Sequence, residues 1–239
     1  MNLCARSKLI WVAILVGSLD WSAIAVRAGS AKTPSAIGSE PQQQPSAKVP
    51  VLDTLIVPGK RAGAITSKTT SNDLTNIFGK QRLTPKKFYG AEGQVELPAT
   101  LITFGKNRSV TVVWKNAKKQ QPFQVMIHDP TWKTASGIGL GTSLTKLRQI
   151  LGEFKITGLG WDYGNQVVDL SSAIQARYTG LSIAVDADRA AAKQFPADLH
   201  AVSGDGVTPV ASDPRWKRLK MHVSHLTVSF PDRSPTVGK

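Results

Sequence analysis

The sequence predicts an α+β fold made of two tandem helix-plus-antiparallel-meander repeats, with the helices on one face of the sheet. Two observations predict it: one segment recurs without a gap and has helical apolar spacing, and strand-like segments follow each copy. A third observation limits how the fold is held together. Cys4 is the only cysteine, so the chain after it has no disulfide, no thiol nucleophile and no thiolate metal ligand.

The start of the chain predicts a cleavable signal peptide over residues 1–28. Two basic residues precede an apolar run at 9–19, and small residues occupy the −3 and −1 positions before the expected cleavage after Ala28. Cleavage after Ala23 or Ala25 is an alternative. An uncleaved membrane anchor is a second alternative, although the run is much shorter than the roughly 20 residues that span a bilayer. We therefore expect a secreted or periplasmic protein with no transmembrane helix after cleavage.

The segment after the signal predicts a disordered linker. Residues 29–50 are rich in Pro, Ser and Gln and have no periodic apolar residues, so they bury too little to stay ordered. We expect the folded part to comprise repeat 1 at 51–126 and repeat 2 at 127–231. A loose tail is expected at 232–239.

The charge of the chain predicts an anionic partner. The whole sequence carries 30 Lys and Arg against 16 Asp and Glu, a net charge of +14. Cleavage after Ala28 removes three basic residues and one acidic residue, which leaves +12. Such a charge favours an anionic envelope polymer or an acidic protein. Nucleic acid is not expected, because export removes that partner; the alternative is that the charge only keeps the protein soluble.

The internal repeat aligns residues 65–79 with 138–152 at a constant offset of 73. Each copy has a hydroxyl residue that can cap a helix, then apolar residues at helical spacing, then a glycine suited to a left-handed C-cap. The hydroxyl residues are Thr70 and Ser143, and the glycines are Gly79 and Gly152. Each copy predicts a helix of about two turns, which must pack on something because it is too short to stand alone.

Strand-like segments follow each predicted helix and form the expected meanders. They cover residues 87–90, 100–104 and 110–114 after the first helix, and 155–161, 166–170 and 181–186 after the second. Turns are expected at 105–109 and 162–165.

The last strand is expected at 219–230, and its apolar alternation changes parity at Ser224 and His225. One extra residue there keeps both halves on one face, which predicts a β-bulge. Before this strand, a helix is expected at 188–195 and a long loop at 196–214.

The second copy, Ile138 to Gly152, resembles the helical signature of the BamE-like (SmpA/OmlA) and β-lactamase-inhibitor-protein fold. That signature reads apolar-x-x-Gly-Met/Thr-Ser/Thr-x-x-x-Val/Leu, and a meander follows it; here Gly141, Thr142 and Leu147 match. Two tandem copies are similar to the inhibitor arrangement, although the first copy has Lys68 in place of the glycine. The resemblance implies the fold and offers inhibition as a function, but the inhibitors carry disulfides that this chain lacks.

A glycine-rich segment carries a second resemblance. The run GLGWDYG at 158–164 is similar to exported bacterial proteins that are uncharacterised. It places two aromatic side chains on or beside a predicted turn, which makes them candidate anchors for a partner.

No residues are predicted to be catalytic, cofactor-binding or metal-ligating. The pair His222 and His225 lacks the further ligands of a zinc site, and Asp188 after Asp186 is explained more simply as a helix cap than as a calcium ligand. The nucleophile-elbow and phosphate-loop motifs are absent from the sequence. We therefore expect a protein that is not an enzyme and binds no cofactor.

The candidate binding surface combines the aromatic turn with basic residues on predicted hairpins. Its members are Trp161, Asp162, Tyr163, Lys106, Arg108, Lys115, Lys118 and Lys119. The alternative is that the lysines are solvated turn residues that discourage aggregation and that Trp161 closes the core.

The sequence thus favours an exported, non-catalytic binding or envelope-associated protein that recognises a protein or an anionic polymer. One alternative is a proteinaceous inhibitor of a secreted or periplasmic hydrolase. The other is a small hydrolase whose catalytic carboxylates are dispersed along the chain.

Overall fold

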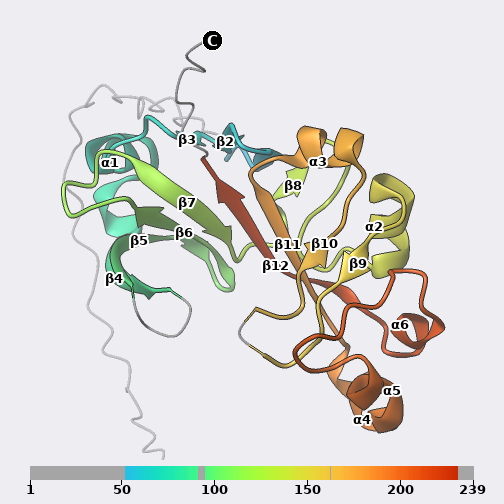
Figure 1. Ribbon diagram of the computed structural model, residues 1–239. Helices are drawn as coiled ribbons and strands as arrows, with labels where there is room; N and C mark the ends of the chain where they lie inside the picture. The colour runs from blue at the N-terminus through green and yellow to red at the C-terminus, as the bar shows by residue number, and fades with distance from the viewer. Residues whose placement is uncertain (1–51, 91–94, 162, 231–239) are drawn as a thin grey trace, which may run out of the picture. The chain divides into compact units, whose positions relative to one another are not determined.

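The computed structural model describes residues 52–90, 95–161 and 163–230 (Figure 1). The predicted signal peptide at 1–28, linker at 29–50 and tail at 232–239 lie outside the described residues, as does Asp162. In the described ranges, no helix combines the length and the apolar character needed to cross a membrane.

The fold is mixed α+β, and its main element is a six-stranded antiparallel sheet of order β11-β12-β7-β6-β5-β4. In this order the strands are β11 (Leu181–Asp186), β12 (His222–Ser229), β7 (Pro122–Ile127), β6 (Arg108–Trp114), β5 (Glu96–Gly105) and β4 (Leu83–Tyr89). β12 lies between β7 and β11, so the sheet joins strands from both halves of the chain.

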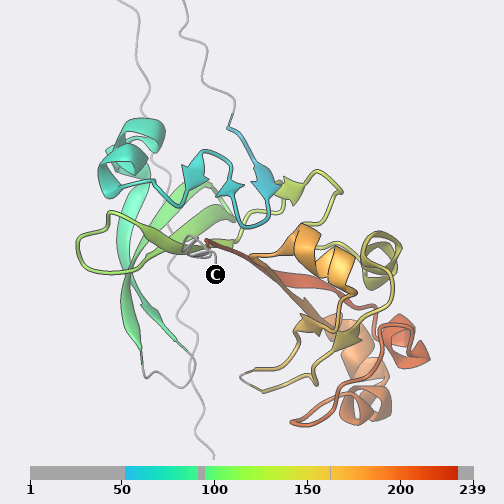
Figure 2. The same ribbon diagram turned by 45° about the horizontal axis from the view of Figure 1, so that its top comes forward.

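Two smaller sheets accompany the main one. β3 (Ile65–Thr66), β2 (Arg61–Ala62) and β1 (Leu55–Val57) form an antiparallel row, and β8 (Lys133–Thr134) pairs with β1 in parallel (Figure 2). The second is a hairpin of β9 (Lys155–Ile156) and β10 (Val167–Val168). Parallel pairing of β1 with β8 ties the start of the folded part to the segment that leads into the second helical copy.

The helices are short. They are α1 (Ser71–Phe78), the 3-10 helix η1 (Lys80–Arg82), α2 (Leu144–Leu151), α3 (Ser172–Tyr178), α4 (Arg189–Gln194), α5 (Pro196–Ala201) and α6 (Pro214–Arg218).

One face of the main sheet forms the core. A row of apolar side chains in mutual register crosses all six strands: Leu83, Ile102, Val110, Ile127, Leu226 and Ile183. Phe104 follows on the same face of β5, where Phe78 of α1 meets it edge to face at 5.7 Å and Trp132 stacks on it at 6.0 Å. Successive side chains of a strand point to opposite faces of the sheet. The residues between these apolar ones therefore lie on the other face, which is mostly polar and is turned away from this core.

The loops before the two repeat helices make matching hydrogen bonds. The Thr66 amide donates to the Thr69 hydroxyl at 2.9 Å, and 73 residues later the Gly139 amide donates to the Thr142 hydroxyl at 3.0 Å. The same offset relates the capping bonds, in which Thr70 and Ser143 accept from the amide three residues on, at 3.2 and 3.3 Å.

Both repeat helices end at glycines with positive φ, as expected. Gly79 has φ 82° and Gly152 has φ 78°, a region that favours glycine. Their ψ values of 138° and −150° differ from the left-handed cap that the sequence predicts. The backbone thus turns out of each helix at the glycine, and after Gly79 it enters the 3-10 helix η1.

The strands expected after the second helix differ from the structure. The predicted strand at 155–161 is reduced to β9, and the one at 166–170 to β10, and these two pair as a hairpin that meets the main sheet through a bridge from Gln166 to Ala184 of β11. The cause is a distant segment: the Gly158 amide donates to Val207 and Leu159 pairs with Ser203, so the chain joins the 202–207 loop instead.

The expected bulge in the last strand is confirmed. Ala184 pairs with His225 and Val185 pairs with Val223, so Ser224 is the extra residue. The predicted loop at 196–214 is wrong in part, because α5 fills its start and α6 begins at its end. Both of these helices begin with proline, which suits the first helical position.

Candidate functional site

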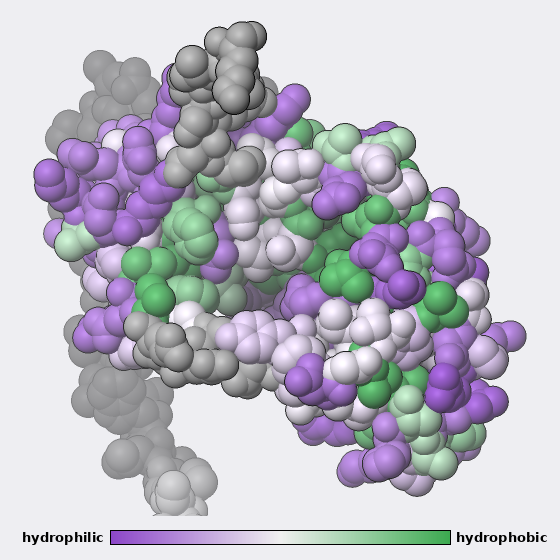
Figure 3. Space-filling view, in the orientation of Figure 1, coloured by the Kyte–Doolittle hydropathy of each residue, from purple (hydrophilic) through white to green (hydrophobic). Residues whose placement is uncertain are grey.

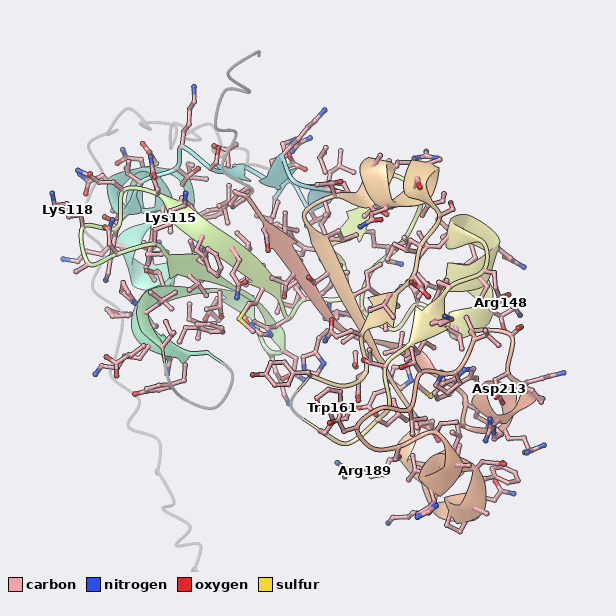
Figure 4. The ribbon with its side chains drawn as sticks, viewed as in Figure 1. Lys115, Lys118, Arg148, Trp161, Arg189 and Asp213 are labelled. Atoms are coloured by element: carbon pink, nitrogen blue, oxygen red, sulfur yellow. The ribbon has the colours of Figure 1, made fainter. Side chains whose placement is uncertain are left out.

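The predicted basic residues occupy two opposite ends of one strand. Lys106 and Arg108 lie at the β5–β6 turn, whereas Lys115, Lys118 and Lys119 lie in the turn between β6 and β7. Seven residues of β6 separate the turns, which is about 20 Å of extended chain. Figure 4 shows Lys115 and Lys118 beside α1, far from Trp161. The structure therefore does not gather the predicted binding residues into one surface.

Arg108 has a structural partner. Its Nε donates to the carboxylate of Asp129 at 2.9 Å, and the Asp129 side chain is fully buried. Asp129 also accepts from the amide and hydroxyl of Thr131. These hydrogen bonds and the guanidinium charge lower the pKa of Asp129 against the opposing effect of its burial. Arg108 thus holds the loop after β7 and is not a free cation for a partner.

The β6–β7 turn has a defined shape. Its backbone closes with a hydrogen bond from the Lys119 amide to the Asn116 carbonyl at 3.1 Å, and the Asn116 side chain accepts from the Lys118 amide at 3.0 Å. The Lys119 carbonyl accepts from the amide of Ser71 at the start of α1. The turn therefore presents its lysines from a fixed backbone attached to both the sheet and the first repeat helix.

The aromatic turn is packed more tightly than its composition suggests. Trp161 is partly buried and meets half-exposed Tyr163 edge to face at 5.6 Å. A Cβ on Gly158 would come within 2.1 Å of the Gly204 carbonyl oxygen, and one on Gly164 within 2.2 Å of the Gly158 carbonyl oxygen. Glycine is required at both positions by close backbone approach, which explains much of this motif by packing alone.

A shallow pocket of about 210 Å³ opens on the polar face of the main sheet, beside the aromatic turn. It is lined by Gln124, Gln166, Ser182, Ala184, His225 and Thr227. The Gln166 side chain donates to the Gly164 carbonyl at 3.4 Å, which ties the pocket to the turn. This pocket was not predicted from the sequence, because β7, which supplies Gln124, was not among the predicted strands.

A larger cavity of about 530 Å³ lies between α2 and α6. Buried Leu144, Trp216 and Met221 contribute to its lining, together with the charged side chains of Arg148, Lys217 and Lys220. This cavity was not predicted from the sequence either, because a loop was expected where α6 begins.

The histidines are divided between these cavities. His222 lines the cavity between α2 and α6, while His225 lines the pocket on the sheet face. His128 lies near His225, and partial burial together with that neighbour lowers its pKa. Among the described residues, no three His, Cys, Asp or Glu side chains are grouped so as to hold a metal ion.

Several acidic side chains have structural roles. Asp73 and Asp188 bond to helix N-termini, and Glu153 pairs with Arg148 while accepting from the Ser212 amide. In each case hydrogen bonds or an ion pair lower the carboxyl pKa. This arrangement favours the ionised form, whereas a carboxyl that serves as a general acid needs a raised pKa.

Comparison with known proteins gives one distant structural match. No family model matches the chain, and no curated protein matches it significantly. A crystal structure of the uncharacterized protein YfeY from Escherichia coli is 14% identical, with a TM-score of 0.43, covering 72% of this chain and 98% of that one.

Proposed function

We propose that the protein is exported to the periplasm or the cell exterior, is not an enzyme, and binds an anionic envelope polymer or an acidic protein. The lysines of the β6–β7 turn, Lys115, Lys118 and Lys119, are the proposed contact. The observation that carries the proposal is the backbone conformation of Lys119, which has φ 51°.

A left-handed conformation disfavours lysine. A side chain with a Cβ costs about 1–2 kcal/mol there, and glycine or asparagine is the usual residue. Lysine at this position therefore works against stability while it places an ammonium group on a protruding turn. Strain of this kind is a pointer to function.

The surroundings of the turn support an electrostatic role. Lys118 is exposed, and no ion pair of Lys118 or Lys119 occurs within the part of the chain that the structure describes. Figure 3 shows hydrophilic residues gathered over the end of the molecule that carries α1 and this turn. Neighbouring ammonium groups attract a polyanion, and salt weakens that attraction.

Two further parts of the proposal have their own support. The signal-like segment at 1–28 supports export, and the use of Asp73, Asp188 and Glu153 in helix caps and an ion pair supports a non-catalytic role. We also propose that 51–126 and 127–231 are tandem copies of one helix-plus-meander unit. The matching hydrogen bonds around Thr69 and Thr142 support this duplication.

A second candidate function is inhibition of a secreted hydrolase. The observation that favours it is the polar sheet face with its pocket at His225, flanked by half-exposed Tyr163. Aromatic residues are common at the centre of protein interfaces. Slowed turnover of any enzyme in a panel of secreted hydrolases, reversed by Tyr163→Ala, would support this function over polymer binding.

The first proposal is tested by retention on a heparin column as the salt concentration rises. We compare the protein with the triple variant Lys115→Ala, Lys118→Ala and Lys119→Ala. A control triple variant, Lys60→Ala, Lys133→Ala and Lys193→Ala, loses the same charge from other sites. The turn variant should elute at clearly lower salt than the control, since phosphate or sulfate contacts release counterions. Equal elution of the two variants would mean that the net charge alone drives retention.

A further inference from the structure

The cavity between α2 and α6 is held open by a fixed frame. The start of α2 is paired with the start of β12, because Ser143 bridges His222 and the Leu144 amide donates to Met221 at 2.9 Å. On the other side, Glu153 accepts from Arg148 at 2.8 Å and from the Ser212 amide at 2.9 Å. The cavity therefore exists in the folded protein without rearrangement, which is typical of ligand sites.

Two of the cationic side chains that line this cavity have no ion-pair partner among the described residues. The lining carboxylate, Asp213, is paired with Arg215, and Arg148 is paired with Glu153. Lys217 and Lys220 are exposed and form no ion pair with any described residue. Figure 4 shows Arg148 and Asp213 on the neighbouring segments that face this side of the molecule. The cavity is thus positive, with its paired groups fixing the walls and two ammonium groups at the rim.

Lys220 stands where a helix normally has glycine. It follows Leu219, the C-cap of α6, and its φ is 49°. Glycine is the common residue at this position, because a Cβ is disfavoured in the left-handed region. The hydrogen bonds to the Asp188 carboxylate come from the amides of Ala190 and Ala191. The positive charge of Lys220 makes a smaller contribution to the lowered pKa of Asp188. The Lys220 ammonium is therefore placed at the cavity at a local conformational cost.

The size and polar groups of the cavity suit one small anion. About 530 Å³ is within the range of small-molecule sites. Hydroxyl groups of Ser143, Thr145 and Ser212 lie in the lining beside the cations, and these are donors for phosphate oxygens. Buried Trp216 and Leu144 form an apolar part of the wall that can contact the remainder of a ligand.

We infer that this cavity binds a small phosphate-bearing molecule, with Lys217 and Lys220 contacting the phosphate. Phosphate carries close to two negative charges at neutral pH, which matches two surplus ammonium groups better than a single carboxylate does. The site uses none of the β6–β7 turn residues. A test of this site is therefore independent of a test of the proposed polymer binding.

The test is calorimetric titration of the protein with pyrophosphate and with glycerol 3-phosphate at constant ionic strength. A second arm measures sedimentation with vesicles that contain phosphatidic acid, whose headgroup is a phosphate monoester, against phosphatidylcholine vesicles. The variant Lys217→Ala with Lys220→Ala removes the two surplus cations. The control variant Lys133→Ala with Lys193→Ala removes the same charge from outside the cavity.

We expect binding in at least one arm, weakened about ten-fold or more in the cavity variant and less than about two-fold in the control. The arm that shows this difference identifies the source of the phosphate, a free molecule or a lipid headgroup. An absence of binding in both arms, or equal weakening in the two variants, would overturn the inference.

Lys220→Gly separates binding from folding. It removes the ammonium group and also relieves the left-handed lysine, so the urea midpoint should rise while phosphate affinity falls several-fold. Unchanged affinity in a variant that is folded and more stable would show that Lys220 does not contact the ligand.

Discussion

At the scale of single residues, Asp129 shows how this protein uses charge inside its fold. Its carboxylate is fully buried at the end of β7, yet it has three hydrogen-bond donors in Arg108 and Thr131. A buried carboxylate is tolerable only with such compensation. The Arg108 side chain is 43% exposed, so solvent screens the pair from outside.

This geometry makes a prediction about Asp129→Asn. The change keeps the size of the side chain but removes the charge, and it turns one acceptor oxygen into an amide donor that faces Arg108 or Thr131. We expect a loss of about 1–3 kcal/mol in the free energy of unfolding, measured by urea denaturation.

The matched control is Asp169→Asn. Asp169 also forms an ion pair, with Lys155 at 2.7 Å, but its side chain is 62% exposed. An exposed pair contributes little, so this variant should stay within about 0.5 kcal/mol of the parent. Equal losses in both variants would mean that burial of Asp129 is not what makes its pair important.

At the scale of elements, the bulge in β12 decides which face of a whole strand meets the core. Ser224 is the extra residue, and Val223 and Leu226 on either side of it are both buried. Without it, one half of the strand would turn its apolar residues to the polar face, because side chains alternate with a period of two.

Deletion of Ser224 is therefore expected to be severe. Either Met221 and Val223 or the three apolar residues from Leu226 onward would leave the core, at about 1.5–3 kcal/mol for each large side chain exposed. We expect loss of the cooperative unfolding transition in circular dichroism. Substitution of Ser224→Ala, which keeps the register, should leave the transition nearly unchanged; a stable deletion variant would contradict the role assigned to the bulge.

The elements that sequence could predict are those with a local cause. The repeat helices have hydroxyl caps, apolar spacing and terminal glycines within one segment, and the bulge follows from parity alone. By contrast, β1, β2, β3 and β8 have two or three residues each, too few for an apolar alternation to show, and β8 forms only by pairing with distant β1. The lengths of the two strands of the β9–β10 hairpin were overestimated. The apolar alternation at 155–161 does not reveal that Gly158 must pack against Gly204.

The candidate site was harder to predict for the same reason. The predicted strand at 110–114 already separates the turn of Lys106 from Lys118, and β6 in the structure has seven residues. The sequence did not show that Arg108 is paired with Asp129, because the two residues are 21 positions apart. The cavity between α2 and α6 joins segments some 70 residues apart, from Ser143 to Trp216, so no local pattern could indicate it.

At the scale of the whole molecule, the distribution of ionised groups predicts how stability depends on pH. Carboxyl groups with lowered pKa occur in both halves of the chain, from Asp53 near β1 to Asp213 before α6. A lowered pKa in the folded state means that the stabilisation is complete above the unfolded value of about 4 and is lost as the pH falls through the folded value.

We therefore expect the urea midpoint to fall steeply below about pH 4. A smaller decline should begin near pH 6.5, where the unfolded chain protonates His128 before the folded protein does. The variant His128→Gln should lose the first decline and keep the second. A midpoint that rises between pH 5 and pH 3 would contradict the assignment of these ion pairs and caps.

The position of β12 has a consequence for synthesis. This strand follows every other strand along the chain, yet it is bonded on both sides, to β7 and to β11. A growing polypeptide therefore emerges from the ribosome with an open strand edge at β7 and an uncovered apolar row, and such edges invite aggregation. The main sheet can therefore close only after β12 has been made.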